Sequence, residues 1–147
     1  MASTASNEAE IRNVIADLSK AVHDKDAKRM LSHYAPDSVI FDLAPPLKHE
    51  GAGAASEQGL KEWFATWQGP IGHETRDVSI TSDGEIAYCH GFIRISGTKV
   101  GGEHADVWAR QTTCLRKIDG AWKIAHDHTS VPFYMDGSFK AAVDLKP

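Results

Sequence analysis

The second half of the chain has the residue pattern of a β-sheet. Four segments rich in β-forming residues are joined by short turns and cover about residues 74–81, 85–96, 103–117 and 121–129. The turns read "SDGE", "GTKVGG" and "IDGA", and this composition suits hairpins. Because hairpins join neighbouring strands, the sequence predicts an antiparallel meander.

The first half has helical periodicity instead. One long stripe of apolar residues recurs at the spacing of a helix face and consists of Ile11, Val14, Ile15, Leu18 and Val22. Asn7 followed by Glu10 resembles a capping box, so we expect the first helix to begin there.

Two shorter helices are expected after it. Asp26 and Ser56 are residue types that favour N-cap positions, and a short strand from Ser38 to Leu43 lies between them. The apolar residues assigned to these two helices are Met30, Leu31 and Tyr34 for the first, and Leu60, Trp63, Phe64 and Trp67 for the second.

Helices grouped first and strands later are typical of an α+β fold. We expect a single domain over residues 1–147, with its core in about 7–132 and a weakly patterned tail at 133–147.

A twisted sheet with helices on its concave side would leave a cavity at one end. The strand at 85–96 has apolar residues in both alternating rows, which predicts a homodimer through the free sheet face.

Composition excludes several classes of partner. The net charge of −4 gives no basic footprint for nucleic acid. No run of about 18 apolar residues is present, so we expect no membrane span. The first residues, "MASTASNEAEIR", lack the basic and apolar regions of a signal peptide, which predicts a cytoplasmic protein.

Three stretches are similar to a known family. "YAPDSVIFD", "LKEWFATW" and "DGAWKIAHDHTSVP" resemble the first strand, third helix and last hairpin of the nuclear-transport-factor-two-like superfamily, in its SnoaL-like and ketosteroid-isomerase-homologue branch. The resemblance implies a cystatin-like, cone-shaped roll: three N-terminal helices packed on a strongly curved, mainly antiparallel sheet. It does not fix the function, because this fold hosts isomerases, dehydratases, cyclases, hydrolases and non-catalytic binders.

The resemblance also points to a carboxylate. Asp42 falls where ketosteroid isomerases have their catalytic base, and a carboxylate there could move a proton next to a carbonyl. The alternative is an aspartate that caps the loop at 44–46. Ketosteroid isomerases also stabilise their enolate with a helix-1 tyrosine and a protonated late-strand aspartate. Leu18 is close to the first position and the second has no clear match, so steroid isomerisation is not predicted.

Two histidines end the last strand. In regular alternation His126 and His128 share a face with Trp122 and Ile124, so we expect them to point inward, toward the cavity.

The hairpin loop decides which residues face these histidines. A three-residue loop pairs them with Thr112 and Arg110, whereas a two-residue turn pairs them with Thr113 and Gln111. We favour the first, because it places Arg110 in the histidine row.

Three interpretations of the histidines remain open. In the first, Asp42 and a histidine form a dyad in which the imidazole is the base. In the second, the cavity only binds, and Arg110 anchors a carboxylate or a similar anion. In the third, His126, His128 and His90 hold a metal ion, although this fold rarely uses one.

We expect a pocket for a small apolar or carboxylate-bearing organic molecule. Asp42 and His128 are the predicted catalytic residues, without metal or cofactor. The residues predicted to contact the substrate are Trp63, Trp67, Arg110 and His126. The two tryptophans fit core packing as well as a pocket wall. The predicted chemistry is isomerisation, dehydration or cyclisation, and the alternative is a non-catalytic binding, accessory or oligomerisation module.

Overall fold

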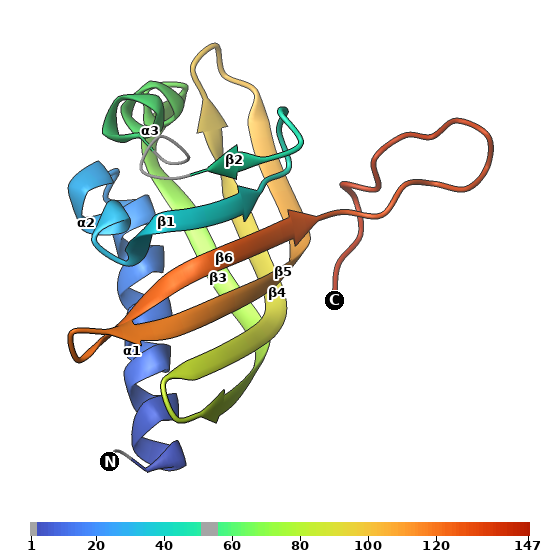
Figure 1. Ribbon diagram of the computed structural model, residues 1–147. Coiled ribbons are helices and arrows are strands. Elements are labelled where there is room, and N and C mark those ends of the chain that lie inside the picture. Colours follow the sequence, from blue (N-terminus) through green and yellow to red (C-terminus); the bar gives the residue numbers. More distant parts are fainter. Residues whose placement is uncertain (1–2, 51–55) are drawn as a thin grey trace.

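The computed structural model describes residues 3–50 and 56–147 as helices packed on one side of a curved sheet (Figure 1). The helices are α1 (Thr4–His23), α2 (Ala27–Leu31) and α3 (Glu57–Phe64). The strands are β1 (Tyr34–Phe41), β2 (His49–Glu50), β3 (Trp67–Asp83), β4 (Ile86–Lys99), β5 (His104–Ile118) and β6 (Ala121–Ser130). The predicted α+β class is confirmed.

The sheet has six strands in the order β2-β1-β6-β5-β4-β3. Neighbours are antiparallel except β1 and β6, which are parallel. The meander from β3 to β6 is confirmed, and its strands extend beyond the predicted bounds. The two-residue strand β2 is too short to leave a sequence pattern and was not predicted.

The three helix starts are set by side-chain caps. Asp26 and Ser56 accept hydrogen bonds from the backbone N–H groups of Arg29 and Gly59, which confirms both predicted caps. The predicted capping box at Asn7 is wrong. Ser3 caps α1, and Asn7 lies one turn inside the helix, where it is buried and donates to the carbonyl of Gly84.

Two aromatic residues belong to strands instead of helices. Tyr34 and Trp67 open β1 and β3, because α2 ends at Leu31 and α3 ends at Phe64. An aromatic residue can bury its ring from either element, so the helical spacing alone did not distinguish them.

The core lies between α1 and the sheet face that it covers, which we call the inner face. Its main cluster joins Ile11 of α1 to Leu115, Trp122 and Ile124 of β5 and β6. A second cluster at the α2–α3 end contains Val22, Ala27, Phe64, Trp67 and Ile71. The opposite side of the sheet is the outer face, which no helix of the described residues covers (Figure 1). None of the described helices is long and apolar enough to cross a membrane.

Candidate functional site

A β-bulge in β6 determines which residues reach the cavity. The β5–β6 turn has two residues, Asp119 and Gly120, both with positive φ, so the favoured three-residue loop is wrong. Leu115 pairs with Ile124, but the next residue of β5, Cys114, pairs with His126. Ala125 is therefore an extra residue in β6, and the alternation of side chains is reversed beyond it.

This bulge reverses the predicted orientation of the histidines. His126 and His128 pair with Cys114 and Thr112, which matches neither predicted register. They lie on the outer face, and the inner-face positions beyond Ile124 belong to Asp127 and Thr129, which are buried. The prediction that the histidines point inward beside Trp122 is wrong because it assumed unbroken alternation.

Asp127 is a buried carboxyl group in a hydroxyl network. It is 5% exposed, and its oxygens accept hydrogen bonds from the Tyr34 hydroxyl at 2.9 Å and the Thr113 hydroxyl at 2.7 Å. Burial raises the pKa of Asp127, and the nearby charge of Asp42 acts in the same direction. The pKa of Tyr34 is raised by burial and by the Asp127 carboxylate. Sequence analysis did not identify either residue as part of a site.

Asp127 lines a cavity between α1 and the inner face. The cavity has an empty volume of about 360 Å³, including its open mouth, and its polar lining residues are Ser19, His73, Thr75, Gln111, Thr113 and Asp127. The remaining walls are aliphatic side chains of α1, β5 and β6. A few polar groups in an apolar cavity are typical of small-molecule sites.

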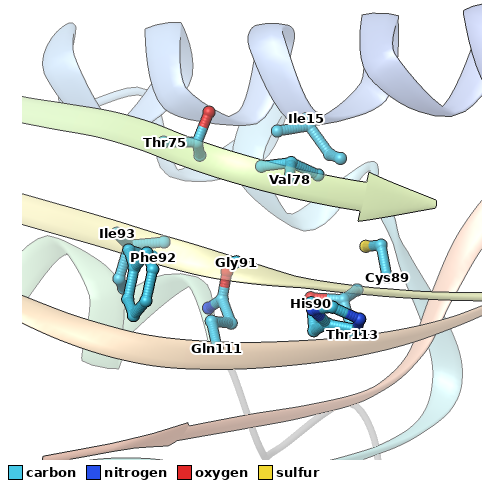
Figure 2. Close-up of a pocket in the computed structure, with 10 residues that line it drawn as sticks. All are labelled: Ile15, Thr75, Val78, Cys89, His90, Gly91, Phe92, Ile93, Gln111 and Thr113. Atoms are coloured by element: carbon cyan, nitrogen blue, oxygen red, sulfur yellow. The ribbon is translucent and has the colours of Figure 1, made fainter. Parts of the chain in front are cut away.

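A second pocket adjoins this cavity and has an empty volume of about 270 Å³, including its open mouth (Figure 2). The two share Ile15, Thr75, Gln111 and Thr113, and the second pocket continues along β4 to Cys89. Burial raises the pKa of the Cys89 thiol to about 11, so this wall is uncharged at neutral pH.

His73 is the second titratable group of the cavity. Its Nδ1 lies 2.8 Å from the Ser19 hydroxyl on α1, which leaves Nε2 for a ligand. Burial lowers the pKa of His73 to about 4, so the imidazole is neutral at pH 7. A neutral imidazole can donate one hydrogen bond and accept another without bringing a charge into the cavity.

We expect the stability of the chain to fall as the pH is lowered from about 6.5 to about 4, in part because of His73. In this window the unfolded imidazole binds a proton that the folded one does not, so protonation favours unfolding. The loss reaches about 3 kcal/mol, at about 1.4 kcal/mol per pKa unit. Urea denaturation at about pH 7 and about pH 4.5 should show a weaker pH dependence for His73→Gln. The exposed His23→Gln is the control, and equal pH dependence in all three proteins would contradict the expectation.

The predicted base Asp42 follows the last residue of β1. It is exposed, and its carboxylate accepts a hydrogen bond from the backbone N–H of Leu43 at 2.7 Å. Its charge contributes to the raised pKa values of both Asp127 and Tyr34. Asp42 thus lies within electrostatic range of the buried carboxyl group, and its catalytic role stays a prediction.

Trp63 and Trp67 lie in the second core cluster. Their rings contact edge to face with centroids 5.9 Å apart, and Trp67 is 6% exposed. Lys99 lies over the Trp67 ring at 4.0 Å. Neither tryptophan lines the two pockets, so the structure supports core packing for both.

The other predicted site residues gather on the outer face. Phe41 contacts the rings of His126 and His128 edge to face, and His126 Nδ1 lies 2.7 Å from the Val39 carbonyl oxygen. Arg110 is exposed on the same face, opposite Ser130. Within residues 3–50 and 56–147, no three His, Cys, Asp or Glu side chains converge as metal ligands would.

Solved structures share this fold. An NTF2-like protein of unknown function from Pseudomonas putida is 28% identical, with a TM-score of 0.85 over 99% of this chain and 100% of its own. A candidate scytalone dehydratase from Novosphingobium aromaticivorans is 15% identical (TM-score 0.75, 84% and 83% covered). A candidate NTF2-like dehydratase from Streptomyces avermitilis is 14% identical (TM-score 0.76, 87% and 97% covered).

The sequence comparisons give the family. A comparison with curated proteins finds no significant match. The SnoaL-like domain family matches residues 11–134, a span that contains α1 from Ile11 onward, the whole sheet and every residue that lines the two pockets. The chain therefore belongs to the SnoaL-like domain family, within the NTF2-like superfamily.

Proposed function

We propose that the chain binds a small, uncharged, partly apolar molecule in the inner-face cavity and catalyses proton transfer on it without a cofactor. The observation that carries this proposal is the buried Asp127 carboxyl group, which lines one cavity with the neutral His73. Titratable groups with perturbed pKa values in an apolar cavity are a frequent mark of acid–base catalysis. The reaction class is isomerase or lyase, and the dehydratase names of two structural neighbours agree with it.

Asp127 is the group that we assign to proton abstraction. A raised pKa makes its carboxylate a stronger base than an exposed aspartate. Each carboxylate oxygen has two acceptor sites, so the bonds from Tyr34 and Thr113 leave capacity for a substrate proton. Those two bonds also fix the orientation of the carboxyl group, which favours a single productive geometry.

His73 is the group that we assign to the substrate oxygen. Nε2 is available, and the hydrogen bond of Nδ1 to Ser19 holds the ring in place. When the carboxylate takes a proton from the carbon next to a carbonyl, charge develops on the carbonyl oxygen. A neutral N–H donor facing that oxygen stabilises it. A dehydratase would use the same pair: the Asp127 carboxyl group, protonated by the first step, would give that proton to the leaving hydroxyl, which departs as water, while His73 keeps its N–H and donates a hydrogen bond to the carbonyl oxygen.

The cavity electrostatics favour an uncharged ligand. No Lys or Arg from the described part of the chain lines either pocket, and His73 is neutral. Arg110, the predicted anchor for a carboxylate, lies on the opposite side of the sheet. A buried anion without a cationic partner is strongly disfavoured, so the proposal narrows the predicted ligands to uncharged ones.

One observation supports a second candidate, ligand binding without turnover. Both oxygens of Asp127 already accept hydroxyl hydrogen bonds, as expected for a carboxyl group with a purely structural role. In that case the cavity selects ligands by shape, and neither titratable group changes protonation state.

Deuterium exchange distinguishes the two candidates. The protein is incubated in D2O with neutral probes, cyclohex-2-enone and 1-tetralone, and with a carboxylate-bearing analogue of each. Proton NMR measures deuteration of the carbon next to the carbonyl. We expect saturable exchange above the buffer rate for the neutral probes only. Probe binding without exchange would support the second candidate, and exchange of the carboxylates alone would contradict the uncharged-ligand assignment.

A further inference from the structure

The C-terminal segment 131–147 forms an arm that projects from the sheet beyond β6 (Figure 1). The arm has its own hydrogen bonds. The Tyr134 N–H donates to the Lys140 carbonyl, the Ala142 N–H donates to the Pro132 carbonyl, and Phe133 forms a β-bridge with Ala141. Asp136 accepts two bonds from Ser138 at the tip. The arm thus has a defined conformation that its own hydrogen bonds stabilise.

The arm exposes its apolar side chains. Met135 is 86% exposed, Phe139 is 67% exposed and Phe133 is 62% exposed. Phe139 also has a φ of 54°, a left-handed conformation that bulky residues rarely adopt. Backbone strain of this kind persists only where the surrounding structure maintains it, and it is concentrated at functional segments.

The arm is continuous with the outer face. The guanidinium of Arg76, on the outer row of β3, donates to the Pro147 carbonyl at 2.9 Å. The Lys146 charge helps to lower the pKa of Asp106, after the larger effect of Arg94, and Asp106 is on the outer row of β5. A single partner molecule could therefore contact both the arm and the outer face.

The outer face presents its own incompletely covered aromatic residues. Tyr88 is 50% exposed, and Phe92, Trp108 and Phe41 are half-buried on the same side of the sheet. Partly exposed apolar patches of this kind on a folded domain are typical of surfaces that contact another protein.

Surface area indicates that the arm does not act alone. A large aromatic side chain buries about 150–250 Å², so three mostly exposed side chains could bury roughly 400 Å² per arm. Two arms would supply roughly 800 Å², whereas a stable interface needs about 1,200–2,000 Å². The outer faces are the adjoining surfaces that could provide the remainder.

Charge also matches between the arm tip and the outer face. Asp136 at the tip bonds only to Ser138, and no cation of the described residues pairs with it. Arg110 on the outer face has no carboxylate partner within the described ranges. Asp136 and Arg110 are thus charges of opposite sign, each beside the apolar residues of its own surface.

We propose that the arm of one copy docks on the outer face of a second copy, so that the two copies exchange arms. Phe133, Met135 and Phe139 pack against the partner's aromatic residues, and Asp136 lies beside the partner's arginine. A two-fold arrangement satisfies both arms at once, because the same contact is made twice. The proposal is independent of the proposed catalytic activity.

Mixed labelling tests the contact directly. A nitroxide is attached to the new cysteine of Met135→Cys in a Cys114→Ser background. This protein is mixed with wild-type protein that is enriched in 15N and carries no nitroxide. Broadening of the 15N amide signals can then come only from the arm of the other copy. We expect broadening at Phe92, Trp108 and Arg110, reversed when the nitroxide is reduced. A dimer without this broadening would overturn the proposal.

Sedimentation equilibrium measures the contribution of the arm. We expect Met135→Ser with Phe139→Ser, and separately Arg110→Glu, to raise the dimer Kd at least about tenfold, a change of about 1.4 kcal/mol. Leu47→Ser is the matched control, because Leu47 is 96% exposed but lies in the β1–β2 connection. Circular dichroism verifies folding. A monomeric wild type, or one that cosediments with phosphatidylcholine vesicles instead of dimerising, would overturn the proposal.

Discussion

Asp127→Asn should reduce proton exchange on the neutral probes by about 10²–10⁴-fold, the usual contribution of a general base. The amide has almost the shape of the carboxyl group but cannot take up a proton at neutral pH. It has one acceptor oxygen instead of two, so either Tyr34 or Thr113 loses a partner. We therefore expect a stability loss of roughly 1–3 kcal/mol, small enough for the fold to persist.

The comparison variant is His128→Ala. His128 is exposed on the outer face of the same strand, one residue from Asp127. Initial exchange rates and urea denaturation of both variants separate loss of chemistry from loss of structure. If His128→Ala removes exchange and Asp127→Asn does not, the outer face holds the catalytic group and our assignment of the cavity is wrong. Asp42→Asn, measured alongside, tests the carboxylate predicted from the sequence.

Ile11→Ala should destabilise the chain by about 2–5 kcal/mol, the usual range for removing a fully buried aliphatic side chain. Ile11 is 0% exposed and belongs to the cluster that joins α1 to β5 and β6. The substitution removes the contacts of the Ile11 side chain within this cluster and leaves a cavity that the surrounding side chains cannot fill completely. Urea denaturation with a two-state fit measures the change in the free energy of unfolding.

Ile86→Ala is the matched control, because it removes the same atoms from a residue that is 62% exposed. We expect a change within about 0.5 kcal/mol, as for most surface substitutions. Similar losses in the two variants would mean that α1 does not pack on the sheet as described. A smaller loss for Ile11→Ala than for Ile86→Ala would contradict the assignment of the core.

Much of the fold could be predicted from residue patterns. The periodicity of the α1 stripe, the caps at Asp26 and Ser56, and the four alternating segments placed most elements within a few residues. The errors occurred where one residue type suits two structures. Asn7 is a good cap but also a good buried donor, and Tyr34 and Trp67 pack equally well from a helix or a strand.

The site was less predictable, for a geometric reason. Side-chain direction in a strand depends on an unbroken count of residues, and Ala125 adds one residue to that count. Nothing in "WKIAHDHTS" marks the extra residue, because alanine is neutral toward a bulge. In unbroken alternation Asp127 would lie on the face opposite Trp122 and Ile124, so the pattern did not indicate it as a cavity residue. His73 was not predicted as a site residue, because its position beneath α1 depends on tertiary packing that no local pattern reveals.

The bulge also bears on how relatives of this chain can diverge. A one-residue insertion or deletion near position 125 would exchange the two rows of the last strand while leaving every later amino acid identical. The lining of the cavity would change from carboxyl and hydroxyl groups to imidazoles without a single substitution. Two relatives that align over "HDHTS" can therefore have chemically different interiors, and only the length of the strand before this motif tells them apart.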